Sequence, residues 1–348
     1  MFSPRLAAPG LMPGRNGRPM PRFNLAALPT PLLPAHRLQA AIGGPLIWVK
    51  RDDLTGFATA GNKARTLEFL IGDALDQRCD VLVSGGGPSS NFCAAAAAAA
   101  RAAGLDCDLV LYGAPPDPHQ PPHPNLSAAL ESGAHVEFTG RPGRDEVDRA
   151  IPSRAAARAA QGRRPYVMPR GGATAVGAAG FARARGELAA QLDVAAVDPG
   201  IIVVATGSGG TQAGLVAGRA PGTAPQPRVL GATVSRPPAQ IRDTVADLAY
   251  RCAALLGRPL PKTEDVEIVD ARGGGFGVPS DAGERARLLA HATEGLVLDP
   301  VYSAKAFAVV LDLVTGGFTR PIVFWHTGGL PAAIHHLTTS ERSALCPT

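Results

Sequence analysis

The chain has 348 residues, 45% of them hydrophobic and 18% charged, which is typical of a soluble globular protein with two lobes or one large α/β domain. Its formal charge of +5 comes from arginines scattered over many segments, with no basic run interleaved with aromatic residues, so nucleic-acid binding is disfavoured and an anionic substrate or cofactor is favoured. No run reaches the ~20 apolar residues that span a membrane, and five cysteines without a CxxC pair disfavour a disulfide framework or metal site and fit a reducing cytoplasm.

The first part of the chain leads to one lysine. Residues 1–22 are rich in Pro, Gly and Arg without periodicity, which predicts a flexible extension. Extended backbone is expected over 28–32 because of its two prolines, a short helix over 35–41 and a strand over 46–49. Lys63 then stands where a glycine-bearing loop becomes a helix, beside free N–H groups and the positive helix end. Taken alone, this segment fits an ordinary solvated lysine better than a Schiff-base lysine. Three glycine loops further along the chain make the Schiff-base lysine the favoured interpretation.

Strands and helices alternate through the rest of the chain, which predicts parallel sheets covered by helices. Residues 165–172 are interpreted as a crossover between lobes. Strands are expected over 81–84, 107–112, 134–138, 201–205, 229–234, 266–269 and 321–325, and helices over 92–103, 125–131, 144–161, 173–192, 212–218, 237–256, 281–294 and 303–315.

The loop at 206–211, TGSGGT, carries the clearest phosphate signal. Its glycines let backbone N–H groups converge on one anion at the start of a helix, and Ser208 and Thr211 add hydroxyl donors. The loop lacks the Lys-Ser/Thr ending of a nucleotide P-loop and does not match GxGxxG with a following acid, so a nucleotide is not favoured.

Two more glycine loops follow strands. The loop at 85–91 opens a helix, although Ser89, Ser90 or Asn91 could serve there only as an N-cap. The loop at 327–329 follows the last strand, at the edge where open α/β sheets bind ligands. A lysine loop and three strand-end glycine loops together predict a phosphorylated cofactor held by its phosphate and by a Schiff base, and pyridoxal 5′-phosphate satisfies both conditions.

Seven motifs in order resemble the tryptophan-synthase-β-like (fold type II) pyridoxal-phosphate enzymes, and within them the D-cysteine desulfhydrase and 1-aminocyclopropane-1-carboxylate deaminase family. The resemblance implies an α/β fold of two open, twisted, mostly parallel sheets with helices on both faces. It also implies a large cofactor-binding domain of 23–63 and 170–348, a small domain of 64–169, and a homodimer. The motifs are PTPL (29–32), KRDDLTG (50–56), GNKAR (61–65), SN (90–91), GSGGT (207–211), LDPVY (298–302) and HTGGLP (326–331).

Carried over residue by residue, the resemblance implies that Lys63 forms the Schiff base and shuttles the Cα proton. Ser90 would face the substrate carboxylate or assist proton transfer, and Tyr302 would approach from the opposite side. A hydroxyl of Thr327 or Ser303 near the pyridine nitrogen would suit β-elimination over transamination. The implied cofactor-binding residues are Asn62, Asn91 (to the 3′-oxygen), Gly207, Ser208, Gly209, Gly210, Thr211 and Thr327.

The sequence departs from the family pattern mainly on the substrate side. Ser303 stands where the deaminases have glutamate, which counts against cyclopropane ring opening. Phe276 replaces an expected tyrosine and cannot donate a proton, and Ala60 replaces a usual glycine before the lysine. These departures suggest altered substrate specificity. The implied substrate-binding residues are Ser89, Phe92, Phe276 and Ser303.

Three functions follow from these expectations. The first is a cytoplasmic, desulfhydrase-like lyase that converts D-cysteine or a β-substituted alanine to pyruvate and ammonia. The second is a β-replacement synthase or amino-acid racemase on the same cofactor, and the third is a non-catalytic binding protein, which Lys63 argues against. His119, His123, His335 and His336 are expected in surface loops or at a helix end.

Overall fold

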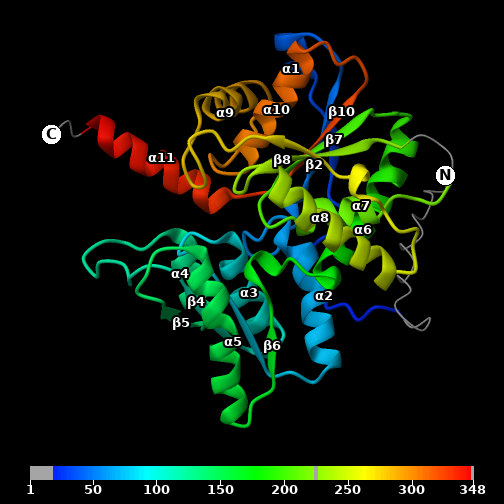
Figure 1. Cartoon of the computed structure of the whole chain (residues 1–348). Coiled ribbons are helices and arrows are strands. Elements are labelled where there is room, and N and C mark those ends of the chain that lie inside the picture. Colours follow the sequence, from blue (N-terminus) through cyan, green and yellow to red (C-terminus); the bar gives the residue numbers. More distant parts are fainter. Residues whose placement is uncertain (1–18, 223–225, 346–348) are drawn as a thin grey trace, which may run out of the picture.

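The computed structural model describes residues 19–222 and 226–345, with side chains to residue 339, and shows two sheets in two lobes (Figure 1). The six-stranded sheet has the order β1-β2-β10-β7-β8-β9 and the four-stranded sheet the order β5-β4-β3-β6. Every pairing is parallel except the antiparallel pairing of β1 with β2. The strands are β1 (Leu32–Pro34), β2 (Ile47–Arg51), β3 (Val81–Gly86), β4 (Asp106–Leu111), β5 (His135–Phe138), β6 (Pro165–Val167), β7 (Ile201–Thr206), β8 (Arg228–Thr233), β9 (Glu267–Asp270) and β10 (Ile322–His326).

Helices cover both sheets, as the alternating pattern predicts. The described α-helices are α1 (His36–Ile42), α2 (Lys63–Asp76), α3 (Asn91–Ala102), α4 (Pro124–Glu131), α5 (Arg144–Ala160), α6 (Ala175–Ala195), α7 (Gly210–Ala217), α8 (Pro238–Leu255), α9 (Asp281–Glu294), α10 (Ser303–Thr315) and α11 (Leu330–Leu345). Short 3₁₀ turns occupy Asp52–Leu54, Arg170–Gly172 and Thr263–Asp265.

Side-chain alternation in β10 explains why helices pack on both faces of the large sheet. Phe324 belongs to the hydrophobic cluster that includes Phe307 of α10, whereas Val323 and Trp325 belong to the cluster that includes Phe181 of α6. Both faces of the sheet are therefore buried in apolar cores. The predicted fold class is confirmed: two mostly parallel sheets with helices on both faces.

Two expectations from the sequence need correction, and a third falls mostly outside the described residues. Residues 165–167 are not only a crossover, because they form β6 and pair with β3 in the small sheet. Residues 330–345 form α11, a helix that the sequence interpretation left out. Of the extension predicted over 1–22, residues 1–18 lie outside the described part, and Arg22 forms an ion pair with Glu68 at 2.8 Å.

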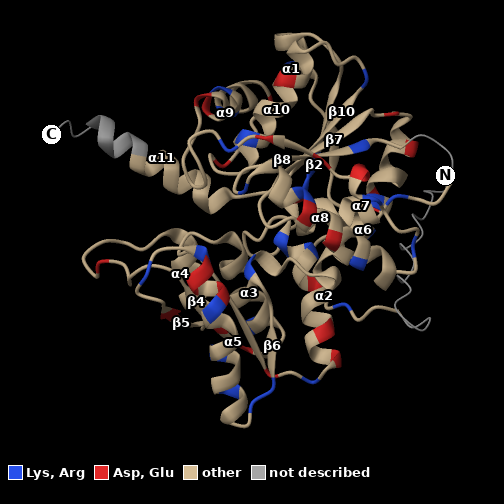
Figure 2. Cartoon of the chain, in the orientation of Figure 1, with Lys and Arg blue, Asp and Glu red and all other residues tan. Residues whose placement is uncertain are grey.

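Charged residues are spread over both lobes, with Lys and Arg interspersed among Asp and Glu (Figure 2). Within the described residues, no helix is long and apolar enough to cross a lipid bilayer. The same part of the chain contains no group of three or more His, Cys, Asp and Glu residues that could hold a metal ion.

Candidate active site

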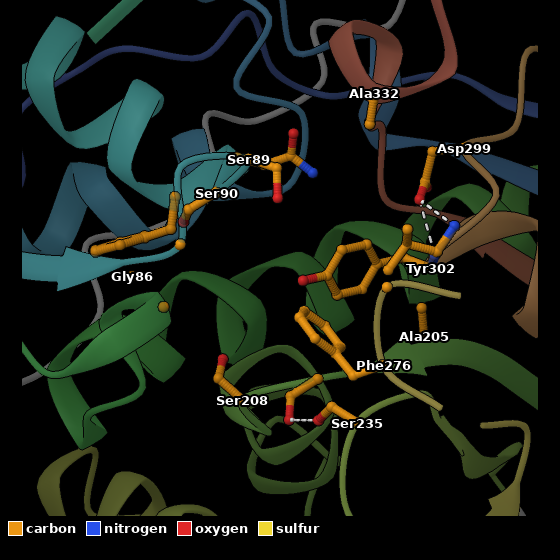
Figure 3. Close-up of a pocket in the computed structure, with 18 of the residues that line it drawn as sticks. Gly86, Ser89, Ser90, Ala205, Ser208, Ser235, Phe276, Asp299, Tyr302 and Ala332 are labelled. Carbon is orange, nitrogen blue, oxygen red and sulfur yellow. Dashed lines mark hydrogen bonds between the residues drawn. The ribbon is translucent and has the colours of Figure 1, made fainter. Parts of the chain in front are cut away.

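A cavity of about 410 Å³ lies between the two lobes and collects all three glycine loops (Figure 3). The loop after β3 enters it from the small lobe, and the loops after β7 and β10 enter it from the large lobe. Because parallel strands present their carboxyl ends on the same edge, loops that are far apart in sequence meet here. Lys63 lines the same cavity.

The backbone places Lys63 at the first position of α2, as the sequence predicts. The N–H of Asn62 donates to the carbonyl of Thr327 at 3.0 Å, which ties this loop to the loop after β10. Gly61 has φ of +53°, and a Cβ there would lie 2.5 Å from the Thr327 carbonyl oxygen. Glycine is therefore required at 61. Ala60 is buried in the core, and its φ is not positive, so alanine is accommodated where the family usually has glycine.

Burial lowers the pKa of Lys63 from 10.5 to about 8. No ion pair or side-chain hydrogen bond joins its amine to another residue in the described part of the chain. At pH 7 about a tenth of these amines are therefore unprotonated, as a nucleophile or general base needs to be, against less than about a thousandth at a pKa of 10.5.

A buried charge network fixes the start of α2 against the large lobe. Arg65 donates to both carboxylate oxygens of Asp52 at 2.9 and 2.8 Å and to Glu187 at 2.8 and 3.0 Å. Lys50 donates to the same Glu187 at 2.5 Å, and the indole of Trp325 donates to Asp52 at 2.8 Å. Because its cations and carboxylates are mutually paired, the network can hold charged groups in the interior. It fixes Arg65 and therefore also the start of α2, where Lys63 lies two residues before Arg65.

The glycine loop after β7 has the geometry of an anion cradle. Gly209 adopts φ of +95° and precedes α7, whose first residue is Gly210. Asn62 donates its amide to the Thr211 hydroxyl at 3.0 Å, which connects the lysine loop to this cradle. Ser235 donates to the Gly207 carbonyl at 3.0 Å and supports the loop from behind (Figure 3). The predicted loop residues that line the cavity are Gly207, Ser208, Gly209 and Thr211, whereas Gly210 is not among its lining residues.

The small-lobe loop brings Ser89, Ser90 and Asn91 to the cavity. Ser90 also caps α3, because its hydroxyl accepts from the N–H of Cys93 at 3.2 Å. Asn125, which the sequence interpretation did not single out, donates to the Asn91 side-chain oxygen at 2.7 Å and to the Ser89 carbonyl at 2.9 Å. With its oxygen occupied, Asn91 keeps its amide hydrogens for a ligand in the cavity.

Phe92 is buried, and its ring packs closely against the backbone of Gly172. Gly172 has φ of +65°, and a Cβ there would lie 2.5 Å from the Phe92 ring. Phe92 lines the cavity with its neighbours, and its ring also fills the space between α3 and the 3₁₀ turn Arg170–Gly172. Packing thus accounts for an apolar ring at this position of the cavity wall.

Tyr302 faces the small-lobe loop across the cavity, with its hydroxyl directed toward the side of Ser89 and Ser90 (Figure 3). Burial raises the pKa of Tyr302 well above its usual value, so its hydroxyl stays protonated at neutral pH. The carboxylate of Asp299 accepts from the N–H groups of Val301 and Tyr302 at 3.0 and 2.7 Å and fixes the backbone at this point.

Ser303 does not occupy the predicted place. It is buried, it is not among the lining residues, and its hydroxyl donates to the Asp299 carboxylate at 2.6 Å. The Asp299 carboxylate also accepts from the N–H of Ser303, the first residue of α10, at 2.9 Å and so holds the serine away from the cavity. Of the two hydroxyls expected near the pyridine nitrogen, Thr327 lines the cavity.

Several lining residues could not be found from motifs. His123, His335 and His336, expected in surface loops or at a helix end, all line the cavity, and the ring centroids of His123 and His335 lie 4.6 Å apart. His123 is the residue that caps α4, whereas His335 lies within the unpredicted α11. The further residues are Tyr112, Arg144, Arg170, Arg236 and Ser235.

The fold and the cavity together define an enzyme that binds a phosphorylated carbonyl cofactor. The glycine cradle supplies convergent N–H groups for a phosphate, and Lys63 supplies an amine of lowered pKa for an aldehyde. These residues fit pyridoxal 5′-phosphate, which carries both groups.

Comparison with known proteins identifies the family. A family model described as pyridoxal-phosphate dependent enzyme matches residues 23–328. The chain is 37% identical to the D-cysteine desulfhydrase of Salmonella newport (strain SL254) over 316 residues, which cover 90% of this chain and 95% of that relative. The crystal structure of an ACC deaminase homologue matches with a TM-score of 0.84 and 32% identity, over 93% of this chain and 96% of the other. The chain therefore belongs to the pyridoxal-phosphate-dependent enzyme family, and the prediction of its cofactor is confirmed.

Proposed function

We propose that this enzyme is a lyase that removes the Cα proton of a small amino acid and eliminates its β-substituent, releasing pyruvate and ammonia from D-cysteine or another β-substituted alanine. The observation that carries the proposal is the position of Lys63 and Tyr302 in one cavity, because one is a base and the other a protonated acid near neutral pH. Similarity to a D-cysteine desulfhydrase and to an ACC deaminase homologue supports this reaction type.

The chain would hold the cofactor through residues of both lobes. The cradle Gly207–Thr211 and the amide of Asn62 would bind the phosphate, and Asn91 would donate to an oxygen on the ring. Pyridoxal 5′-phosphate, when bound, supplies an aldehyde that condenses with amines and a ring that accepts electrons from Cα. Lys63 would attack that aldehyde when the cofactor is loaded and would hold the Cα proton on its Nζ during turnover.

The groups around the ring favour elimination. Asp299 is the one carboxylate among the described lining residues, and it already accepts from three backbone N–H groups and the Ser303 hydroxyl. Thr327 would therefore offer the pyridine nitrogen a hydroxyl and not a carboxylate. On the substrate side, Tyr302 would donate a proton to the leaving group, and Ser89 and Ser90 would bind the α-carboxylate.

Pyruvate release tests the proposal. The purified holoenzyme is incubated with D-cysteine and with neutral β-substituted alanines such as β-chloroalanine, beside the Lys63→Ala variant. We expect pyruvate from the wild type and only background from Lys63→Ala, because no amine then remains at the head of α2. Lys262→Ala is the matched control, since Lys262 is 76% exposed and is not among the residues that line the cavity. A wild-type holoenzyme that releases no pyruvate from any β-substituted alanine would contradict the proposal.

We further propose a homodimer that works in the cytoplasm. The four described cysteines are free, which supports a reducing compartment. The division into a large domain of 23–63 and 170–348 and a small domain of 64–169 also stays a prediction. Light scattering of the purified protein tests the dimer: a mass near 35.6 kDa would show a monomer and contradict it.

A further inference from the structure

Three arginines come together on the wall of the cavity from three separate elements. Arg144 is the first residue of α5, Arg170 begins the turn before α6, and Arg236 lies between β8 and α8. Burial lowers the pKa of Arg144 and of Arg236 most, the charge of Arg170 lowers both further, and Arg236 also acts on Arg144, so the three guanidinium groups are close enough to interact. Such a cluster of like charges is unfavourable unless anions accompany it.

The nearby carboxylates compensate this charge only in part. Arg170 forms a two-pronged ion pair with Asp148, with both distances 2.6 Å. Asp148 and Asp145 both act electrostatically on Arg170 and Arg236, but neither forms an ion pair with Arg236. No carboxylate or other acceptor within the described residues receives a hydrogen bond from the guanidinium of Arg144 or Arg236. The guanidinium groups of Arg144 and Arg236 are thus without a hydrogen-bonded anionic partner among the described residues.

An aromatic ring holds Arg144 in place over the substrate side of the cavity. Its guanidinium carbon lies 3.6 Å from the centroid of the Phe276 ring, which in turn packs edge-on against Tyr302 with centroids 6.0 Å apart. A cation over an aromatic face is attracted to it and loses little freedom when a ligand arrives. Phe276, which departs from the expected tyrosine, therefore acts as the platform of a positively charged group.

We infer that Arg144 and Arg236 recognise a second negative charge on the substrate, so that the enzyme prefers amino acids whose β-substituent is a carboxylate, a sulfonate or a similar anion. The inference rests on the proposed function, since it assigns the substrate class of that same site. Guanidinium groups bind such planar or tetrahedral oxyanions through paired, charge-assisted hydrogen bonds. The α-carboxylate and the cofactor phosphate have other donors, in the small-lobe loop and in the Gly207–Thr211 cradle.

Binding of two unreactive probes tests this assignment. The probes are 3-sulfopropanoate and butanoate: both carry one carboxylate, neither has an amine, and only the first has a second charge. Calorimetry is done on the wild-type holoenzyme and on Arg144→Gln, Arg236→Gln and Arg251→Gln. The last is the control, because Arg251 is 64% exposed on α8 and is not a cavity residue. We expect the wild type to bind 3-sulfopropanoate about tenfold or more tightly than butanoate, and each cavity variant, but not the control, to lose most of that preference.

Three results would overturn the inference. The wild type could bind both probes equally, and this result can be read even if no variant folds. The cavity variants could weaken both probes equally, which would assign the arginines to the shared carboxylate. Arg144→Gln and Arg236→Gln could lose pyridoxal 5′-phosphate on dialysis with the probe preference unchanged, which would assign them to the phosphate. Because the probes do not react, a holoenzyme that prefers 3-sulfopropanoate but releases no pyruvate would contradict the proposed lyase alone.

Discussion

Lys63 and Tyr302 show how burial, the largest cause for both, adjusts the pKa values of two side chains in opposite directions. Removal from water disfavours the charged form of each, so the pKa of the lysine falls and that of the tyrosine rises. The same cavity thereby holds a partly unprotonated amine and a fully protonated phenol. Such a pair can accept one proton and donate another without a metal ligand or an activating carboxylate.

The lowered pKa of Lys63 predicts the pH dependence of cofactor loading. Only the unprotonated amine attacks an aldehyde, and this form becomes dominant above about pH 8, not above 10.5. We expect the rate at which apoenzyme takes up pyridoxal 5′-phosphate to rise about tenfold from pH 6 to 7 and to level off by pH 9. Absorbance that survives borohydride reduction and denaturation measures the uptake. A rate that climbs unchanged through pH 10 would show a lysine of ordinary pKa.

Tyr302→Phe tests the proposed acid. The variant keeps the ring against Phe276 and removes only the hydroxyl, so we expect kcat to fall on the order of 10²-fold with little change in KM. Tyr250→Phe is the control, because Tyr250 is 50% exposed and outside the cavity. A rise in KM at unchanged kcat would mean that the hydroxyl binds substrate and transfers no proton.

At the scale of secondary structure, each functional group is held by an element that is itself anchored elsewhere. The start of α2 depends on the network of Lys50, Asp52, Arg65 and Glu187, which joins it to β2 and α6. The start of α10 depends on Asp299, whose carboxylate accepts from the N–H groups of Tyr302 and Ser303 and thereby fixes Tyr302. Buried polar groups thus bind the first turns of α2 and α10, and this fixes the positions of Lys63 and Tyr302.

Glu187→Gln tests the anchoring of α2. The substitution leaves Lys50 and Arg65 buried with less negative charge, so we expect a loss of about 3–5 kcal/mol in the free energy of unfolding, measured by denaturant titration. Glu264→Gln breaks an ion pair whose side chains are about 75% exposed, and should cost no more than ~1 kcal/mol. Equal losses in the two variants would contradict a special role for the network.

The network also determines how the stability of the fold changes at acidic pH. Pairing with Arg65 and Lys50 lowers the pKa of Glu187 from 4.5 to about 2, against the opposing effect of burial. Its stabilising contribution is therefore present above about pH 4.5 and is lost as the pH falls toward 2.

At the scale of the whole molecule, α11 bridges the two lobes, and several of its residues line the cavity. It follows the glycine loop after β10, packs against α4 of the small lobe, and runs outward toward the C-terminus (Figure 1). His335 of α11 and His123 of α4 meet at this contact. The cavity is thus bordered by a contact between lobes that contains two titratable rings.

His123 makes the stability of this contact depend on pH. Burial, with a smaller effect of His335, lowers the pKa of His123 from 6.5 to about 4. A lowered folded-state pKa means that its contribution is present above pH 6.5 and is lost as the pH falls toward 4. We expect His123→Asn, which can still cap α4, to lose less stability than the wild type between pH 7 and pH 5 in thermal unfolding. The same loss in both proteins would contradict the assignment.

The sequence by itself determined the local structure and the cofactor apparatus of this protein. Apolar runs ending in glycine loops specified the strands and their ligand-binding edge, and the segments around Lys63 and Gly207–Thr211 pointed to pyridoxal 5′-phosphate. These signals are readable because they depend on backbone conformation within a few residues. Short segments were harder to predict. The three residues of β6 are too few to show a strand pattern, and they form a strand because β3 pairs with them.

Only the tertiary structure decided which side chains share the cavity with that apparatus. Arg144, Arg170 and Arg236 come from three separate segments, and nothing in their local sequences indicates that they converge. Ser303 was expected at the ligand but is turned away, because the carboxylate of Asp299 binds its hydroxyl. Convergence depends on how two lobes pack, and packing is fixed by the sum of many contacts between distant residues, which no single stretch of sequence records.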